Sequence, residues 1–150
     1  MNKITFPHMG FYYIPVNYLL ENITKKEIII PPKITKKTIE LGSKYSPDYV
    51  CMPFKYNLGN FIEGLDLGAN VILQAGGGCR YGYYAELQEQ ILKDLGYKFT
   101  LINFIENNRV SIPKIYQFAK KENPKLNVFS FTYFAINTII MIITMDKLSK

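Results

Sequence analysis

A chain of 150 residues has room for one hydrophobic core and is too short for two, so we expect a single domain over residues 1–150. Hydrophobic residues make up 48% and charged residues 20% of the chain, which excludes a disordered protein. The 18 Lys and Arg exceed the 12 Asp and Glu by six, but they are scattered singly or in pairs, so no basic stripe indicates nucleic-acid binding.

Short apolar runs alternate with helix-patterned segments along the first hundred residues. Strands are expected at 3–6, 27–30, 49–51, 71–73 and 98–104. Helices are expected between them at 12–21, 33–41, 58–67 and 83–95, the second of them ending at Gly42. Short connections between such elements imply parallel crossovers. We therefore predict a doubly wound, mostly parallel, Rossmann-like α/β sheet with helices on both faces.

The last third departs from this alternation. A helix is expected at 112–121, and the following run 126–145 holds 20 residues without a charge. That length would span a bilayer. Asn137 and several Ser and Thr residues interrupt the run, however, and favour a buried or partner-facing apolar helix over membrane insertion. An apolar helix at the end of the chain also favours a truncated protein, in which these residues form the amino-terminal domain of a longer architecture.

Cys51 and Cys79 are the two cysteines of the chain. They form no CxxC pair, and no signal-peptide pattern precedes them, so we expect a reducing, cytoplasmic location. By the strand assignment, Cys51 ends the third strand and Cys79 follows the fourth. Because parallel strands present their carboxyl ends at one edge, the two thiols are expected to share a crevice there.

The turn around Cys79 contains three glycines and a cation. Backbone N–H groups at Gly76, Gly77 and Gly78 can hydrogen-bond cluster sulfurs, while the helix N-terminus and Arg80 favour the thiolate form of Cys79. The same turn could instead bind the phosphate of a nucleotide or CoA. A third alternative is a glycine turn beside a buried cysteine. Two thiolates are an incomplete set of the usual four cluster ligands.

The other polar residues form no catalytic constellation. His8 is the only histidine, and we interpret it as a turn or strand-end residue. No paired carboxylates and no triad pattern stand out, so the residues alone leave it open whether the chain is an enzyme.

Four segments, at 5–13, 32–42, 49–59 and 74–84, resemble the amino-terminal part of 2-hydroxyacyl-CoA dehydratase components and CoA-substrate-specific enzyme activases. The resemblance extends from about residue 4 to residue 101, and the cysteine-arginine turn is its most specific part. It implies an oxygen-sensitive iron–sulfur protein of anaerobic metabolism, with a cluster of the 4Fe–4S type. Cys51 and Cys79 match the first two cluster cysteines, and further ligands come from a part of the longer family members that this chain does not contain.

The implied role is low-potential electron transfer or dehydration of an acyl-CoA, as a lyase component or its activator. The implied partners are an activator or dehydratase subunit, or a second copy of the chain. One alternative is a metal-free module that binds a nucleotide or CoA phosphate at the 76–80 turn. Another is an interaction domain that docks a partner through the apolar tail 126–145.

Overall fold

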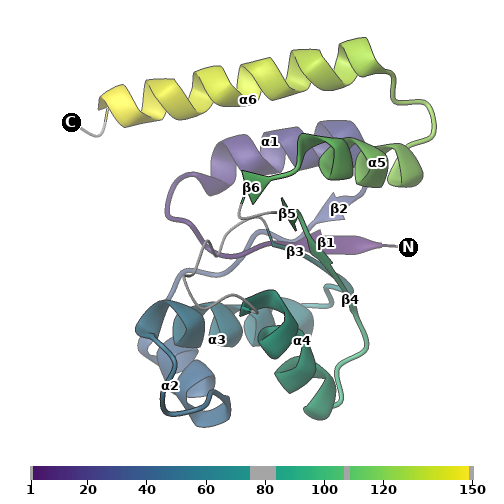
Figure 1. Ribbon diagram of the computed structural model, residues 1–150. Coiled ribbons are helices and arrows are strands. Elements are labelled where there is room, and N and C mark those ends of the chain that lie inside the picture. Colours follow the sequence, from purple (N-terminus) through teal and green to yellow (C-terminus); the bar gives the residue numbers. More distant parts are fainter. Residues whose placement is uncertain (1, 75–83, 107–108, 149–150) are drawn as a thin grey trace.

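The structure, a computed structural model, describes residues 2–74, 84–106 and 109–148 (Figure 1). Its central element is a four-stranded sheet in which every neighbouring pair of strands is parallel. The strands, in the spatial order β2-β1-β3-β4, are β2 (Glu27–Ile28), β1 (Lys3–Thr5), β3 (Val71–Gln74) and β4 (Thr100–Asn103). A separate antiparallel pair consists of β5 (Ile105–Glu106) and β6 (Arg109–Val110). The predicted α/β class with a parallel sheet is confirmed.

Helices cover both faces of the sheet (Figure 1). One face carries α1 (Tyr13–Thr24), α5 (Ile112–Glu122) and, outside them, α6 (Val128–Leu148). The other face carries α2 (Lys36–Tyr45), α3 (Met52–Asp66) and α4 (Tyr84–Asp94). The apolar tail expected at 126–145 is therefore a helix, and α6 is the one helix in the described residues that is long and apolar enough to span a membrane.

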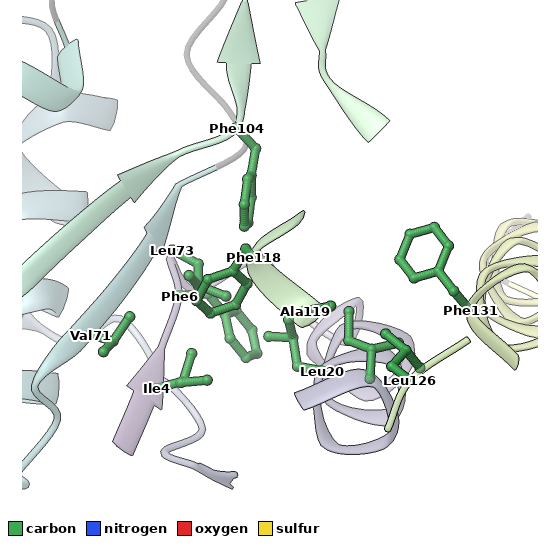
Figure 2. Packing of buried hydrophobic residues seen from close by; sticks show 11 residues of the cluster. Ile4, Phe6, Leu20, Val71, Leu73, Phe104, Phe118, Ala119, Leu126 and Phe131 are labelled. Atoms are coloured by element: carbon green, nitrogen blue, oxygen red, sulfur yellow. The ribbon is translucent and has the colours of Figure 1, made fainter. Parts of the chain in front are cut away.

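Side chains of β3 alternate between two hydrophobic cores, as the two-residue period of a strand requires. Val71 and Leu73 belong to the core beneath α1 and α5, whereas Ile72 belongs to the core shared with α3 and α4. Figure 2 shows the first core, where the strand residues face Leu20 of α1 and Phe118 of α5. Because both faces of the strand are buried, its residues 71–73 are all apolar.

Two glycines allow α2 and α3 to pack with their backbones in direct contact. A Cβ atom at Gly42 would overlap the backbone oxygen of Lys55, and one at Gly59 would overlap the backbone oxygen of Thr38. The prediction that Gly42 ends the second helix was wrong, because α2 continues to Tyr45. Gly42 is instead the point at which α2 meets α3.

The strand expected at 49–51 was also wrong. Asp48 and Tyr49 form a turn, and Cys51 is the N-cap residue of α3, which begins at Met52. Proline in the first turn of a helix needs no hydrogen-bond donor and already has a helical φ, and Pro53 occupies that position in α3. The β-branched and aromatic character of Tyr49 and Val50 suggested a strand, but the proline that follows marks the start of a helix.

Candidate functional site

The connections that follow the two central strands diverge toward opposite faces of the sheet. β1 and β3 are hydrogen-bonded neighbours, yet α1, which follows β1, and α4, which follows β3, lie on opposite faces of the sheet (Figure 1). Open parallel sheets bind ligands in the crevice created at such a divergence. The carboxyl edge between β1 and β3 is therefore the part of this fold where a ligand site is expected.

Cys51 lies at this edge. It is exposed, and its Sγ atom is 2.9 Å from the hydroxyl oxygen of Tyr84, the first residue of α4. The Tyr84 ring also packs edge-to-face on Phe54, with ring centroids 4.9 Å apart. These contacts hold the first turns of α3 and α4 together beside the carboxyl end of β3.

The surroundings of Cys51 favour its thiolate. The hydrogen bond from the Tyr84 hydroxyl is the largest influence that lowers the pKa of the Cys51 thiol, and the backbone N–H of Phe54 acts in the same direction. Partial burial opposes them and is the weaker influence. Position at a helix N-terminus also favours a negative sulfur, because unpaired N–H groups there create a positive potential. Cys51 is thus an exposed thiol whose environment promotes nucleophilic or metal-binding chemistry.

A buried amide pair connects β3 to the same helices. The side-chain nitrogen of Gln74 donates to the side-chain oxygen of Gln88 at 3.2 Å, and Gln88 donates to the backbone oxygen of Phe54 at 3.3 Å. Gln74 is only 1% exposed, and its Oε1 atom has no hydrogen-bond partner in the part of the chain that the structure describes. A buried carbonyl oxygen without a donor is costly, so a ligand or water that donates to it would be favoured.

A second set of polar contacts surrounds His8, which lies just after β1. The side-chain oxygen of Asn60, from α3, accepts the backbone N–H of His8 at 3.0 Å, and its nitrogen donates to the backbone oxygen of Pro32 at 2.8 Å. The Nδ1 atom of His8 is buried and has no partner among residues 2–74, 84–106 and 109–148. Polar atoms without a partner in the described part of the chain therefore lie just after β1, at His8, and at the end of β3, at Gln74. Because β1 and β3 are neighbours, both belong to the same edge of the sheet.

Sequence reasoning did not identify this polar lining. Gln74, Gln88 and Asn60 are each about 1% exposed or less, although they belong to elements that bury mainly apolar side chains. The available signal was the position of Gln74, which directly follows the apolar run of β3 and precedes the glycine-rich turn. A buried glutamine there requires a polar partner across the core.

The sequence-predicted site residues divide into two groups. Cys51 lies at the expected edge of the sheet, although it is held there by the start of α3 and not by the end of a strand. The other five, Gly76, Gly77, Gly78, Cys79 and Arg80, lie outside the described residues. Within the described ranges, no group of three or more His, Cys, Asp or Glu side chains could hold a metal ion.

Comparisons of the chain with models of protein families, with curated proteins and with solved structures found no match.

Proposed function

We propose that this chain is an iron–sulfur protein related to 2-hydroxyacyl-CoA dehydratases and their activators, and that Cys51 and Cys79 are cluster ligands. The observation that carries the proposal is the contact of the exposed Cys51 thiol with Tyr84. Tyr84 is the first described residue after the segment 75–83, and that segment contains Cys79. A thiol that favours its thiolate form thus adjoins the segment that carries the second cysteine.

The described residues fit a thiolate ligand at Cys51 and do not complete a ligand set. Cys51 has the exposure and the lowered pKa that a metal-binding thiol needs. With Cys79, the chain contributes two of the four thiolates that an iron–sulfur cluster commonly uses. The remaining ligands would come from a partner subunit, from a second copy, or from a longer form of the protein.

Each part of the proposed site has a separate task. The cluster, when bound, supplies one-electron transfer at low potential. Cys51 and Cys79 would hold it, and the Tyr84 hydroxyl would donate a hydrogen bond to the Cys51 sulfur and moderate its charge. In the proposal, backbone N–H groups at 76–78 and the Arg80 cation would serve the same purpose for Cys79. An acyl-CoA is the proposed substrate of the assembled system, which we place in an anaerobic cytoplasm.

Anaerobic purification followed by iron and sulfide analysis tests this proposal. The wild-type chain, purified or reconstituted without oxygen, should be brown and contain iron and acid-labile sulfide in equal amounts. Cys51→Ser and Cys79→Ser should each lose most of both elements. Met52→Ser is the matched control, because it changes the adjacent exposed residue and leaves both thiols in place. A colourless wild-type chain after reconstitution, or full iron content in Cys51→Ser, would contradict the proposal.

A second candidate function follows from the polar atoms at the carboxyl edge between β1 and β3. The strand order β2-β1-β3-β4 with helices on both faces supports a doubly wound, Rossmann-like arrangement, and such sheets bind nucleotides at this edge. Nδ1 of His8 and Oε1 of Gln74 have no hydrogen-bond partner among residues 2–74, 84–106 and 109–148, and in this alternative a ligand supplies one there. In this alternative the chain is metal-free, and the 76–80 turn binds the phosphate of a nucleotide or CoA.

Thermal unfolding distinguishes the two candidates. A metal-free binding module should be stabilised by CoA or ATP, by about 2.7 kcal/mol when the ligand is at a hundred times its Kd. Arg80→Ala should abolish the shift, while Arg109→Ala, which removes an exposed cation from β6, and Cys51→Ser should preserve it. Loss of the shift in Cys51→Ser together with loss of iron would favour the cluster. No shift with either ligand would argue against the metal-free module.

A further inference from the structure

An apolar groove lies between the segment that follows β1 and the carboxyl-terminal end of α6. The end of α6 lies beside the start of α1 (Figure 1), and the Tyr12 hydroxyl donates a hydrogen bond to Asp146 of α6. The large side chains that line the groove are Met9, Phe11, Tyr12, Ile14, Met145 and Leu148. Two segments from opposite ends of the chain therefore form one hollow.

The groove has the size of a ligand site. Its volume is about 580 Å³, which falls within the range of about 300–1,000 Å³ that small-molecule sites occupy. Its walls include exposed apolar side chains, among them Phe11, which is 73% exposed. Apolar side chains that converge on one hollow are stabilised when a hydrocarbon group displaces water from them. The groove therefore favours an apolar occupant.

The groove adjoins the carboxyl edge of the sheet. Met9 directly follows His8, which lies just after β1 at the edge where open parallel sheets bind ligands. Cys51 lies at the same edge. A ligand bound at this edge can therefore extend one of its groups along the groove.

The lining determines which chemical group fits. Apart from Tyr12, the large side chains of the groove carry only hydrocarbon or thioether groups. The Tyr12 hydroxyl is bonded to the Asp146 carboxylate, and that negative charge repels a phosphate or a carboxylate. The methionines are flexible enough to adapt to the shape of an aliphatic chain. The lining therefore favours an uncharged aliphatic group.

We propose that this groove holds the acyl chain of an acyl-CoA, and that it selects an uncharged aliphatic acyl group longer than acetyl. The inference rests on the proposed function for the thioester itself, and the groove adds the class of acyl group. A dicarboxylic acyl group is excluded, because its second carboxylate would approach Asp146.

Displacement of a neutral apolar dye, N-phenyl-1-naphthylamine, from the full chain tests the groove. Octanoyl-CoA should displace the dye at a lower concentration than hexanoyl-CoA, while acetyl-CoA, glutaryl-CoA and CoA should leave it bound. Each added methylene should lower the displacing concentration by about two- to fourfold, the upper value corresponding to complete burial of the methylene. 1-Octanol should also displace the dye, because the groove contacts only the hydrocarbon.

Phe11→Asp should abolish dye binding, because it places a second carboxylate in the wall of the groove. Phe129→Asp is the matched control and should bind the dye as the wild-type chain does. Phe129 is also an exposed phenylalanine, at 88%, and belongs to α6 without lining the groove. Both substitutions replace exposed side chains, so both variants should retain the circular dichroism spectrum of the wild-type chain.

Failure of the groove and failure of the cluster give different results. A wild-type chain that binds no dye, equal displacement by octanoyl-CoA and acetyl-CoA, dye binding that persists in Phe11→Asp, or its loss in Phe129→Asp would overturn the acyl groove. Iron and sulfide in the wild-type chain would be unaffected by any of these results. An iron-free chain that still discriminates between acyl lengths would contradict the cluster and support the groove.

Discussion

Replacing Gly59 by alanine should separate α2 from α3 and destabilise the protein strongly. Gly59 lies in the middle of α3 with a helical backbone, so alanine adds no backbone strain of its own. The obstacle is the carbonyl oxygen of Thr38 in α2, which a Cβ atom would overlap, while the backbone nitrogen of Gly42 would be 3.0 Å away. Both obstructing atoms belong to backbone within a helix, so relief requires movement of a whole helix.

The expected cost combines two opposing effects. Alanine favours a helix over glycine by about 1 kcal/mol. Overpacking a tight interior site costs about 1–3 kcal/mol and sometimes more. Because backbone cannot move aside as a flexible side chain can, we expect an overpacking cost above this range, about 4 kcal/mol, and therefore a net loss of about 3 kcal/mol. That is a large share of the roughly 5–15 kcal/mol that stabilises a typical domain. For a chain of this size it lowers the Tm by roughly 6–12 °C.

Denaturant and thermal unfolding, followed by far-ultraviolet circular dichroism, measure this loss. Gly64→Ala is the matched control in the same helix, since a Cβ there would meet only the Thr5 side chain, at 3.3 Å. We expect Gly64→Ala to remain within about 1 kcal/mol of the wild-type free energy of unfolding, because helix propensity offsets the mild crowding. Equal stability of Gly59→Ala and Gly64→Ala would refute the close contact between α2 and α3.

Two further predictions concern titration. Tyr84→Phe removes the hydroxyl that lowers the pKa of the Cys51 thiol, so in a Cys79→Ser chain the pH midpoint of Cys51 alkylation should rise; an unchanged midpoint would count against this hydrogen bond. Burial and the hydrogen bond to Asp66 raise the pKa of Tyr97 to about 12 from its ordinary value of 10.0. The stabilisation that Tyr97 contributes is therefore complete below pH 10 and is lost as the pH rises through about 12, which unfolding measurements over that range can follow. Asp66→Asn should bring the ultraviolet titration of Tyr97 to lower pH, and a titration that does not move would exclude Asp66 as a cause.

Sequence patterns predicted most of the elements correctly. The run at 71–73 and the shorter runs at the start of the chain and near residue 100 are strands of one parallel sheet. Alternation of strands with helices implies this arrangement, because a parallel pair needs a crossover between its strands. The antiparallel pair β5 and β6 was not predicted, since two-residue strands carry no measurable period.

The errors share a physical cause. Tyr49 and Val50 suit a strand, but Pro53 and the contact of Cys51 with Tyr84 place this segment at the start of a helix. Gly42 resembles a helix stop when only its own helix is considered. Its actual role depends on Gly59, seventeen positions away in the chain, and no local pattern records that pairing. Tertiary contact overrides local preference at such positions.

The candidate site was predicted in part. The carboxyl edge of the sheet followed from the alternation of strands and helices. Cys51 was expected there as the last residue of a strand, whereas the start of α3 places it there. The amide pair of Gln74 and Gln88 could not be predicted, because fourteen residues separate them and each is polar within an apolar element. A buried amide is favourable only when its partner is present, and that partner is brought near by folding.

The sequence by itself determined the α/β class, the parallel sheet and the apolar final helix, because hydrophobic period and turn residues act over a few neighbouring positions. Only the tertiary structure decided that Cys51 meets Tyr84, that α2 and α3 touch through glycines, and which side of α6 stays uncovered. Those features depend on the distances between elements far apart in the chain. Such distances are set when the two cores pack around the sheet.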